Sequence, residues 1–343
     1  MRELVEELFA GDDAWVVGGA VRDHALGRPV VDLDVAIRDP ERAARAYARD
    51  SGGAPFPLSD RHGAWRVALD QDRTVDFTPL PGSIQQDLAD RDFSINAIAQ
   101  RVGADETVDP YDGYGDLAGG RIRAVSESVF QNDPLRLLRA ARLEDELDFR
   151  MTPDTEELVR RDAALVTRPA GERVVAELWR LSPSGYRRLD DLGLLDALGG
   201  RIDDRLDRWD SPEYRLVAIF GERLRRFPVS NDLRKLASAL LRAERPEPDA
   251  RSIHRFRRAT EPWALEALAF VGAPELREAV EGARRNDPAE PLVRGDELGL
   301  PPGPEIGRLL AEIEEERAVG TIATKEEALD YARRRSGPVR QDG

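Results

Sequence analysis

The chain has 343 residues and a formal net charge of −15, from 51 lysine and arginine against 66 aspartate and glutamate side chains. With 41% hydrophobic residues, this length suits about two domains with sizeable cores. Because there is no cysteine, the composition excludes disulfide frameworks, cysteine-ligated zinc or iron–sulfur sites and thiol nucleophiles.

No segment indicates membrane insertion or targeting. No apolar run approaches the roughly 18 residues that a membrane span needs, and the N-terminus is acidic where a signal peptide is basic and then apolar. We therefore expect a cytoplasmic protein without a membrane partner, and no pattern predicts a protein partner. The acidic balance also argues at first against nucleic acid, because basic residues drive binding to phosphate backbones.

Two kinds of hydrophobic pattern divide the chain near residue 125. Before it, short apolar runs with strand character alternate with a helical pattern at 41–50, and these runs lie at 14–19, 30–37, 64–69 and 73–80. After it, helical periods dominate, at 133–147, 152–166, 171–181, 303–319 and 324–335. Suitable N-caps are Asp133, Thr152 and Thr324. We expect an α/β N-terminal domain followed by an all-helical remainder.

The first candidate functional segment is a strand followed by two glycines and a helix start. The strand runs into Gly18 and Gly19, and Arg22 follows on the helical segment. Paired glycines let the backbone approach a phosphate, and N–H groups at a helix start favour an anion. Arg22 would add a charged donor to the same anion. The pattern predicts a phosphate-binding turn.

Two carboxylates follow on the next predicted strand. Asp32 and Asp34 are two residues apart, so both side chains project from one face. They would repel each other without a cation between them, and oxygen ligands suit Mg²⁺. A phosphate cradle beside a divalent-metal site is what nucleotidyl transfer needs. Asp76, on a later strand, is a candidate third catalytic carboxylate.

Six motifs in a fixed order carry a resemblance to a known family. They are GGAVRD (18–23), LGRPVVDLD (26–34), RDFSINAIA (91–99), DPYDGYGDL (109–117), NDPLRLLRAARL (132–143) and GERVVAELWRL (171–181). With these motifs the chain resembles the class II tRNA nucleotidyltransferases and the closely related bacterial poly(A) polymerases. The resemblance covers nearly the whole chain.

The resemblance implies a fold and an activity. The fold would be an α/β nucleotidyltransferase head with a small mixed sheet at 1–125, followed by an all-α neck at 126–200, body at 201–290 and tRNA-binding tail at 291–343. The activity would be template-independent addition of CCA to the 3′ end of tRNA, from CTP and ATP, with Mg²⁺ as cofactor. Residues 201–258 hold 15 basic and 10 acidic side chains, so this part could meet the tRNA backbone despite the acidic total.

The resemblance also implies roles for single residues. Asp32 and Asp34 match the Mg²⁺ ligands. Residues that match contacts with the nucleotide's phosphates or ribose are Gly18, Gly19, Arg22, Arg91, Asp92 and Asn96, of which the last two match residues that sense the ribose 2′-hydroxyl. Asp133 and Arg136 match the pair that reads the edge of the base.

The spacing of the last motif supports a base-reading role. Asp133, Arg136, Arg139 and Arg142 are three residues apart, so on a helix they drift slowly around one side. An aspartate acceptor and an arginine donor together suit the hydrogen-bonding edges that cytosine and adenine share in shape. Alternatively, an isolated segment of this kind is an amphipathic helix with solvated arginines.

Two departures from the family pattern leave more than one activity open. Asn132 stands where the family commonly has an acid, so the orientation of Arg136 would rest on a hydrogen bond. Only the ten residues 81–90 separate the strand motif from RDFSINAIA, where many CCA-adding members have a longer flexible loop associated with the switch from C to A addition. A short loop resembles the CC-adding subgroup. Addition of A alone, poly(A) synthesis and the role of an inactive RNA-binding relative also stay open.

Overall fold

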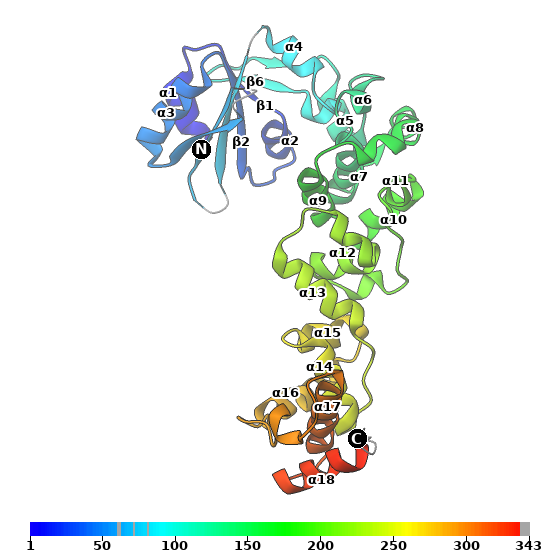
Figure 1. Ribbon diagram of the computed structural model, residues 1–343. Coiled ribbons are helices and arrows are strands. Elements are labelled where there is room, and N and C mark those ends of the chain that lie inside the picture. The colour runs from blue at the N-terminus through cyan, green and yellow to red at the C-terminus, as the bar shows by residue number, and fades with distance from the viewer. Residues whose placement is uncertain (60–62, 71–72, 81, 337–343) are drawn as a thin grey trace. The chain divides into compact units, whose positions relative to one another are not determined.

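The computed structural model describes residues 1–59, 63–70, 73–80 and 82–336 (Figure 1). Within these ranges the chain forms two compact units, the first ending at Leu206 and the second beginning at Asp207. The finer boundaries expected at 125, 200 and 290 stay predictions.

The first unit begins with a mixed β-sheet. Its strands are β1 (Ala14–Val17), β2 (Asp32–Ile37), β3 (Ala54–Ser59), β4 (Ala64–Ala68), β5 (Thr74–Pro79), β6 (Ala99–Arg101) and β7 (Thr107–Val108). Their spatial order is β3-β4-β5-β2-β1-β6-β7. Neighbours are antiparallel except β2 and β5, which are parallel. The expected strands at 14–19, 30–37, 64–69 and 73–80 are confirmed. Sequence patterning missed β3, because its Pro55 and Pro57 suit only an edge strand.

Helices surround this sheet and then make up the rest of the first unit. They are α1 (Arg2–Phe9), α2 (Gly19–Ala25), α3 (Pro40–Ser51), α4 (Ile84–Ala89), α5 (Gly113–Ala118), α6 (Val129–Asn132), α7 (Arg136–Leu147), α8 (Pro153–Asp162), α9 (Gly171–Trp179), α10 (Pro183–Asp191) and α11 (Leu194–Ala197). Between them, β8 (Arg121–Ile122) and β9 (Arg150–Met151) form a short parallel pair. The expected α/β head followed by helices is confirmed. Among the described residues, every helix is too short or too polar to span a membrane.

The two faces of the sheet differ in what covers them. On one face, Phe77 of β5 contacts the rings of Phe9 in α1 and Tyr47 in α3, with centroids 5.7 and 5.9 Å apart. Figure 1 shows α1 and α3 packed together on that side of the sheet. Because strand side chains alternate between faces, Asp34 and Asp76 lie on the opposite face. That face is left open to carry polar chemistry.

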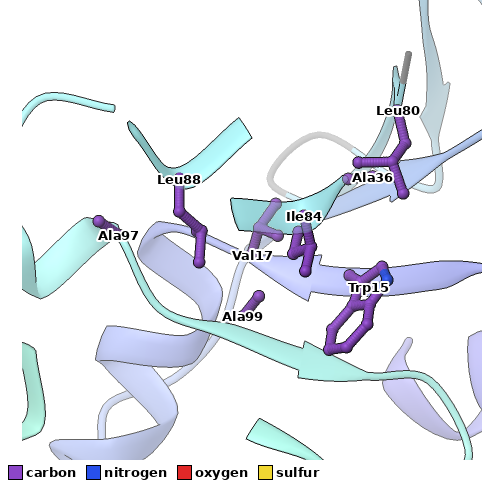
Figure 2. Close-up of a cluster of buried hydrophobic side chains, with 8 residues drawn as sticks. All are labelled: Trp15, Val17, Ala36, Leu80, Ile84, Leu88, Ala97 and Ala99. Carbon is purple, nitrogen blue, oxygen red and sulfur yellow. The ribbon is translucent and has the colours of Figure 1, made fainter. Parts of the chain in front are cut away.

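An apolar cluster covers the rest of this second face (Figure 2). Ile84 and Leu88 of α4 pack onto Trp15 and Val17 of β1. Ser83 and Gln86 form a capping box at the start of α4, which satisfies two backbone N–H groups. Full burial of a side chain such as Leu88 stabilises the fold by about 1.5–3 kcal/mol. The segment expected to be a short loop thus contains a capped helix at Ile84–Ala89 that buries Ile84 and Leu88, while residue 81 lies outside the described ranges.

Two caps expected from the sequence are confirmed and a third is altered. Thr152 caps α8 and Thr324 caps α18 (Lys325–Arg335), each accepting from a backbone N–H group. Asp133 accepts from the backbone N–H of Leu135 at 3.1 Å, but regular α7 begins only at Arg136. The first turn is tightened by hydrogen bonds to the third residue back, as in a 3₁₀ turn.

The second unit is helical throughout its described part. Besides α18, its helices are α12 (Pro212–Phe220), α13 (Asn231–Arg242), α14 (Ala250–Thr260), α15 (Ala264–Val271), α16 (Arg277–Arg285) and α17 (Pro304–Ala318). The helices expected at 303–319 and 324–335 are confirmed. Glu315 of α17 accepts from Arg251 and Arg255 of α14 at 2.5 and 2.7 Å. The most basic stretch of the sequence therefore faces acidic partners within its own unit.

Candidate active site

Strand register brings the predicted carboxylates together on the open face of the sheet. Asp34 of β2 lies directly beside Asp76 of β5, and Asp32 lies beside Thr74. The Thr74 hydroxyl donates to Asp32 Oδ1 at 2.7 Å. Asp32 is exposed and Asp34 is half-buried. The two carboxylates that the sequence placed on one face do share it, with Asp34 deeper in the structure.

Asp34 is a carboxylate in an unfavourable setting. Burial raises its pKa to about 6; Arg91 and Arg66 oppose the shift, whereas Asp76 and Asp32 add to it. Within the described ranges, no hydrogen-bond donor reaches the Asp34 carboxylate. A half-buried acid with acidic neighbours and no donor is stabilised by a cation, and carboxylate oxygens are ligands that Mg²⁺ prefers. Asp32 and Asp34 therefore fit a divalent metal.

Asp76 is held differently from the other two acids. Arg66 of β4 donates to both of its oxygens, from Nε to Oδ1 and from Nη2 to Oδ2, each at 2.7 Å. In the part of the chain that the structure describes, no three acidic or histidine side chains are arranged to hold a metal ion. The structure thus places Asp76 beside Asp34 but gives it an arginine partner that the sequence did not predict.

The glycine turn lies against these carboxylates. Gly18 has φ of +69°, and a Cβ there would lie 2.6 Å from Arg91 Nη1 and 3.5 Å from Asp34 Oδ2. A side chain at position 18 would therefore be strained and would enter the space between the arginine and the acid. Next to it, Arg22 packs back over Gly19. The turn brings its backbone and Arg91 close to Asp34, with Arg22 beside Gly19; its role as a phosphate cradle stays a prediction.

A chain of hydrogen bonds links this turn to the neck helices. Arg22 donates to Asn96 Oδ1 at 2.7 Å, and Asn96 Nδ2 donates to Asp92 Oδ1 at 2.9 Å. Asp92 is 5% exposed, and Arg139 of α7 donates to its other oxygen at 3.0 Å. Burial alone would raise the pKa of Asp92. The positive charge of Arg139, together with the hydrogen bonds that Asp92 accepts from Asn96, Arg139 and the Phe93 backbone, holds that pKa below its usual value. Asp92 is therefore an ionised centre that joins the Gly18 turn, through Asn96 and Arg22, to Arg139 of α7.

The pair expected to read the base and the two arginines expected beside it on the helix do not form one cluster. Asp133 binds Arg173 of α9 at 2.9 Å, and Arg136 donates to the backbone carbonyls of Arg91 and Asp90 at 3.3 and 2.5 Å. The Asn132 amide donates to Ser128 Oγ at 3.4 Å, and among the described residues Arg136 donates to those carbonyls instead of to the Asn132 side-chain oxygen. Asp133 and Arg136 are neighbours in sequence whose side chains are held by separate partners.

The other two arginines of α7 share a partner on α9. Arg139 and Arg142 donate to the two oxygens of Glu177 at 3.3 and 2.5 Å. Arg142 is 8% exposed and also binds Glu146 at 2.6 Å. Arg139 faces the site through Asp92, whereas Arg142 lies on the far side of Glu177.

Sequence reasoning missed four residues that hold the predicted ones. Arg66 binds Asp76, and Arg173 binds Asp133. Glu177 binds the α7 arginines, and Asp87 of α4 binds Arg91 at 2.9 Å. Some signals were available: Asp87 and Arg91 are four residues apart, and Arg66 is a charge within an apolar strand. Arg173 and Glu177 lie inside the GERVVAELWRL motif, which was used only for the resemblance.

Comparisons with known proteins identify relatives of this chain. The family described as "Poly A polymerase head domain" matches residues 14–80 and 64–123. The A-adding tRNA nucleotidyltransferase of Deinococcus radiodurans is 35% identical, over 94% of this chain and 95% of that protein. The CC-adding tRNA nucleotidyltransferase of Thermus thermophilus is 32% identical, over 94% of each. The solved Thermotoga maritima CCA-adding enzyme, complexed with tRNA, has a TM-score of 0.65 at 22% identity, over 97% of this chain and 94% of that one.

Proposed function

Because this chain belongs to the tRNA nucleotidyltransferase family, and is thus a nucleotidyl-transferring enzyme, we propose that it adds CCA to the 3′ end of tRNA from CTP and ATP. The single observation that carries the proposal is the donor-free Asp34 beside Asp32 and the Gly18 turn. This arrangement suits a metal-bound triphosphate. The relatives' names point to the 3′ end of tRNA as the acceptor.

The proposed chemistry divides between the metal and the chain. In the reaction, the primer 3′-hydroxyl attacks the α-phosphate, a new P–O bond forms, and the bond to the β-phosphate breaks to release pyrophosphate. Mg²⁺, held by Asp32 and Asp34, would supply positive charge against the charge that develops on the phosphate. Arg22 and Arg91 would bind the triphosphate, and the Gly18 turn would admit it without a side-chain clash.

Ribose and base recognition are proposed for the head–neck network. Asp92 and Asn96 would face the ribose, and Asp133 and Arg136 would present an acceptor and a donor to the base. Support comes from the fixed partners of each group: Arg139 for Asp92, and backbone carbonyls for Arg136. Groups that are already held lose little freedom when they bind a ligand. Arg139 and Arg142 complete this nucleotide-binding set, with Arg142 acting through Glu177.

A second candidate, addition of CC alone, is favoured by α4. The segment that aligns with the flexible loop of CCA-adding members is short and forms a capped helix, with Ile84 and Leu88 buried in the apolar cluster. A helix anchored in this way is poorly suited to the large movement expected of a loop that switches from C to A addition. In a cell with a CC-adding chain of this kind, another enzyme would add the terminal A.

Primer extension separates these activities. The full chain with Mg²⁺ would be given tRNA ending at the discriminator base, at C or at CC, with CTP and ATP singly and together. Extension to CCA supports the first proposal, and a stop after CC supports the second. Use of only the CC-ended primer with ATP would indicate A addition, and long A tails a poly(A) polymerase.

The matched variants test the site itself. Asp32→Ala/Asp34→Ala should lower incorporation at least about a hundredfold, because the charge-stabilising group is lost. The control Asp105→Ala removes an exposed acid in a turn of the same domain and should leave the rate unchanged. Full activity in the double variant would contradict the proposed catalytic role of Asp32 and Asp34. No incorporation by the native chain with any primer would contradict the proposed activity and favour an inactive RNA-binding relative.

A further inference from the structure

A row of three charged side chains crosses the open face of the sheet. Arg66 of β4 pairs in register with Asp76 of β5, and Asp76 pairs in register with Asp34 of β2. Directly paired residues on neighbouring strands project from the same face, so the three side chains lie next to one another. The order is arginine, acid, acid, with the metal-fitting Asp34 at the end of the row.

Both oxygens of Asp76 are committed to Arg66. The two parallel N–H donors of the guanidinium meet the two carboxylate oxygens at 2.7 Å each, and Asp76 is 8% exposed. This fork geometry is the strongest form of arginine–carboxylate pairing, and it fixes the orientation of the acid as well as its charge. Asp34, by contrast, has no donor within the described ranges. Of these two neighbouring acids, Asp76 is therefore hydrogen-bonded through both oxygens and, in the part of the chain that the structure describes, Asp34 through neither.

We propose that Arg66 is a positioning residue that keeps Asp76 out of the metal's ligand set. This inference rests on the proposed function and deepens its metal site. Among the side chains, Asp32 and Asp34 alone hold the cation, and substrate phosphates and water supply the remaining oxygen ligands. In this role for Arg66, Asp76, which the sequence suggested as a third catalytic carboxylate, does not bind the metal. The arrangement among described residues, where no three acids converge, fits the proposal.

Loss of Arg66 would change the metal site, an effect that loss of an ordinary structural ion pair would not have. Without Arg66, Asp76 becomes an uncompensated carboxylate next to Asp34, free to turn an oxygen toward the cation. An additional anionic ligand raises the affinity of an oxygen site for a divalent cation. Loss of Arg66 should therefore tighten metal binding in the absence of nucleotide, and only while Asp76 keeps its charge.

Mn²⁺ binding to the full chain, followed by electron paramagnetic resonance without nucleotide, tests this. Arg66→Gln should tighten binding by about tenfold. The double variant Arg66→Gln/Asp76→Asn, which removes both charges of the pair, should return to the native affinity. Arg66→Lys keeps a charge without the fork and should tighten binding less than Arg66→Gln. It serves as the second variant if Arg66→Gln does not fold. Arg73→Gln, which removes an exposed arginine bound to Asp70 in the same hairpin, is the matched control and should have no effect.

The outcomes separate this proposal from the proposed function. If the double variant Arg66→Gln/Asp76→Asn binds Mn²⁺ more weakly than the native chain, Asp76 is a ligand and the proposal is overturned. The same holds if neither Arg66 variant tightens binding, or if tightening persists when Asp76 is neutralised. Asp32→Asn/Asp34→Asn tests the underlying metal site independently. Retained Mn²⁺ binding in that variant would contradict the assignment of Asp32 and Asp34 as metal ligands, whatever the Arg66 variants do.

Discussion

Each unit of the protein contains one glutamate held by two arginines of a neighbouring helix. In the first unit, Glu177 of α9 binds Arg139 and Arg142 of α7; in the second, Glu315 of α17 binds Arg251 and Arg255 of α14. The exposed fractions of the arginine side chains are 32% and 9% in the first trio, against 38% and 66% in the second.

This difference in burial decides what each trio contributes. A buried charge that loses its partner is left in a poor solvent, whereas an exposed charge regains water. The trio around Glu177 also continues through Asp92 to the active site, and the trio around Glu315 joins two helices at the surface of the second unit. Similar arginine spacing in the sequence therefore leads to a buried network around Glu177 and to a solvent-exposed network around Glu315.

The largest expected effect is that of Glu177→Gln. The amide keeps the shape but removes the charge that the two arginines share, leaving Arg139 with Asp92 and Arg142 with Glu146. Loss of this buried charged partner should destabilise the first unit by about 1–3 kcal/mol. Hydrogen exchange of the α7 and α9 amides reports this locally. A loss no larger than that of Glu315→Gln would show that burial does not distinguish the two trios.

The pKa values of Asp34 in the first unit and Glu315 in the second are shifted in opposite directions. Burial raises the pKa of Asp34 to about 6, whereas Arg255, opposed by burial and assisted by Arg251, lowers the pKa of Glu315 to about 2. A proton competes with a cation at Asp34, so Mn²⁺ affinity should fall by up to about tenfold per pH unit below 6. Calorimetric titration at pH 7 and pH 5 measures this, and equal affinities would contradict the raised pKa.

Glu315→Gln should have a modest effect on stability. The pairs it breaks are partly exposed, so the second unit should lose about 1 kcal/mol or less, and less still at high salt. Because the pKa of Glu315 is lowered on folding, its stabilisation is fully present above its unfolded pKa and is lost as the pH falls toward 2. Urea unfolding at pH 7 and pH 3, followed by hydrogen exchange in α14 and α17, checks both statements.

The smallest expected effect is on tRNA binding. Arg251 and Arg255 already face Glu315, so Arg251→Gln/Arg255→Gln should change tRNA affinity by less than about twofold and leave its salt dependence unchanged. Native binding itself should weaken steeply with salt. If the double variant lowers the slope of log affinity against log salt by about 2, the α14 arginines contact phosphate, and the second trio is part of an RNA surface.

Local patterns predicted much of the fold and proposed the residues of the candidate site. Alternation identified the strands that carry Asp34 and Asp76, and the caps at Thr152 and Thr324 were confirmed. The capping box of α4 was also a local signal, but the segment was interpreted by its length and taken as a loop. Its helical state depends on Ile84 and Leu88 finding the sheet, which is a tertiary contact.

The sequence by itself determined the family, the α/β head with its helical remainder, and which residues have the chemistry of a metal and nucleotide site. The net charge of −15 did not reveal how individual charges are used, since that depends on partners distant in the chain. Only the tertiary structure decided that Asp76 faces Arg66, that Asp133 faces Arg173 and that Asp34 has no donor within the described ranges. The physical reason is that strand register and helix packing, rather than sequence spacing, set the burial and the counter-charge of each acid.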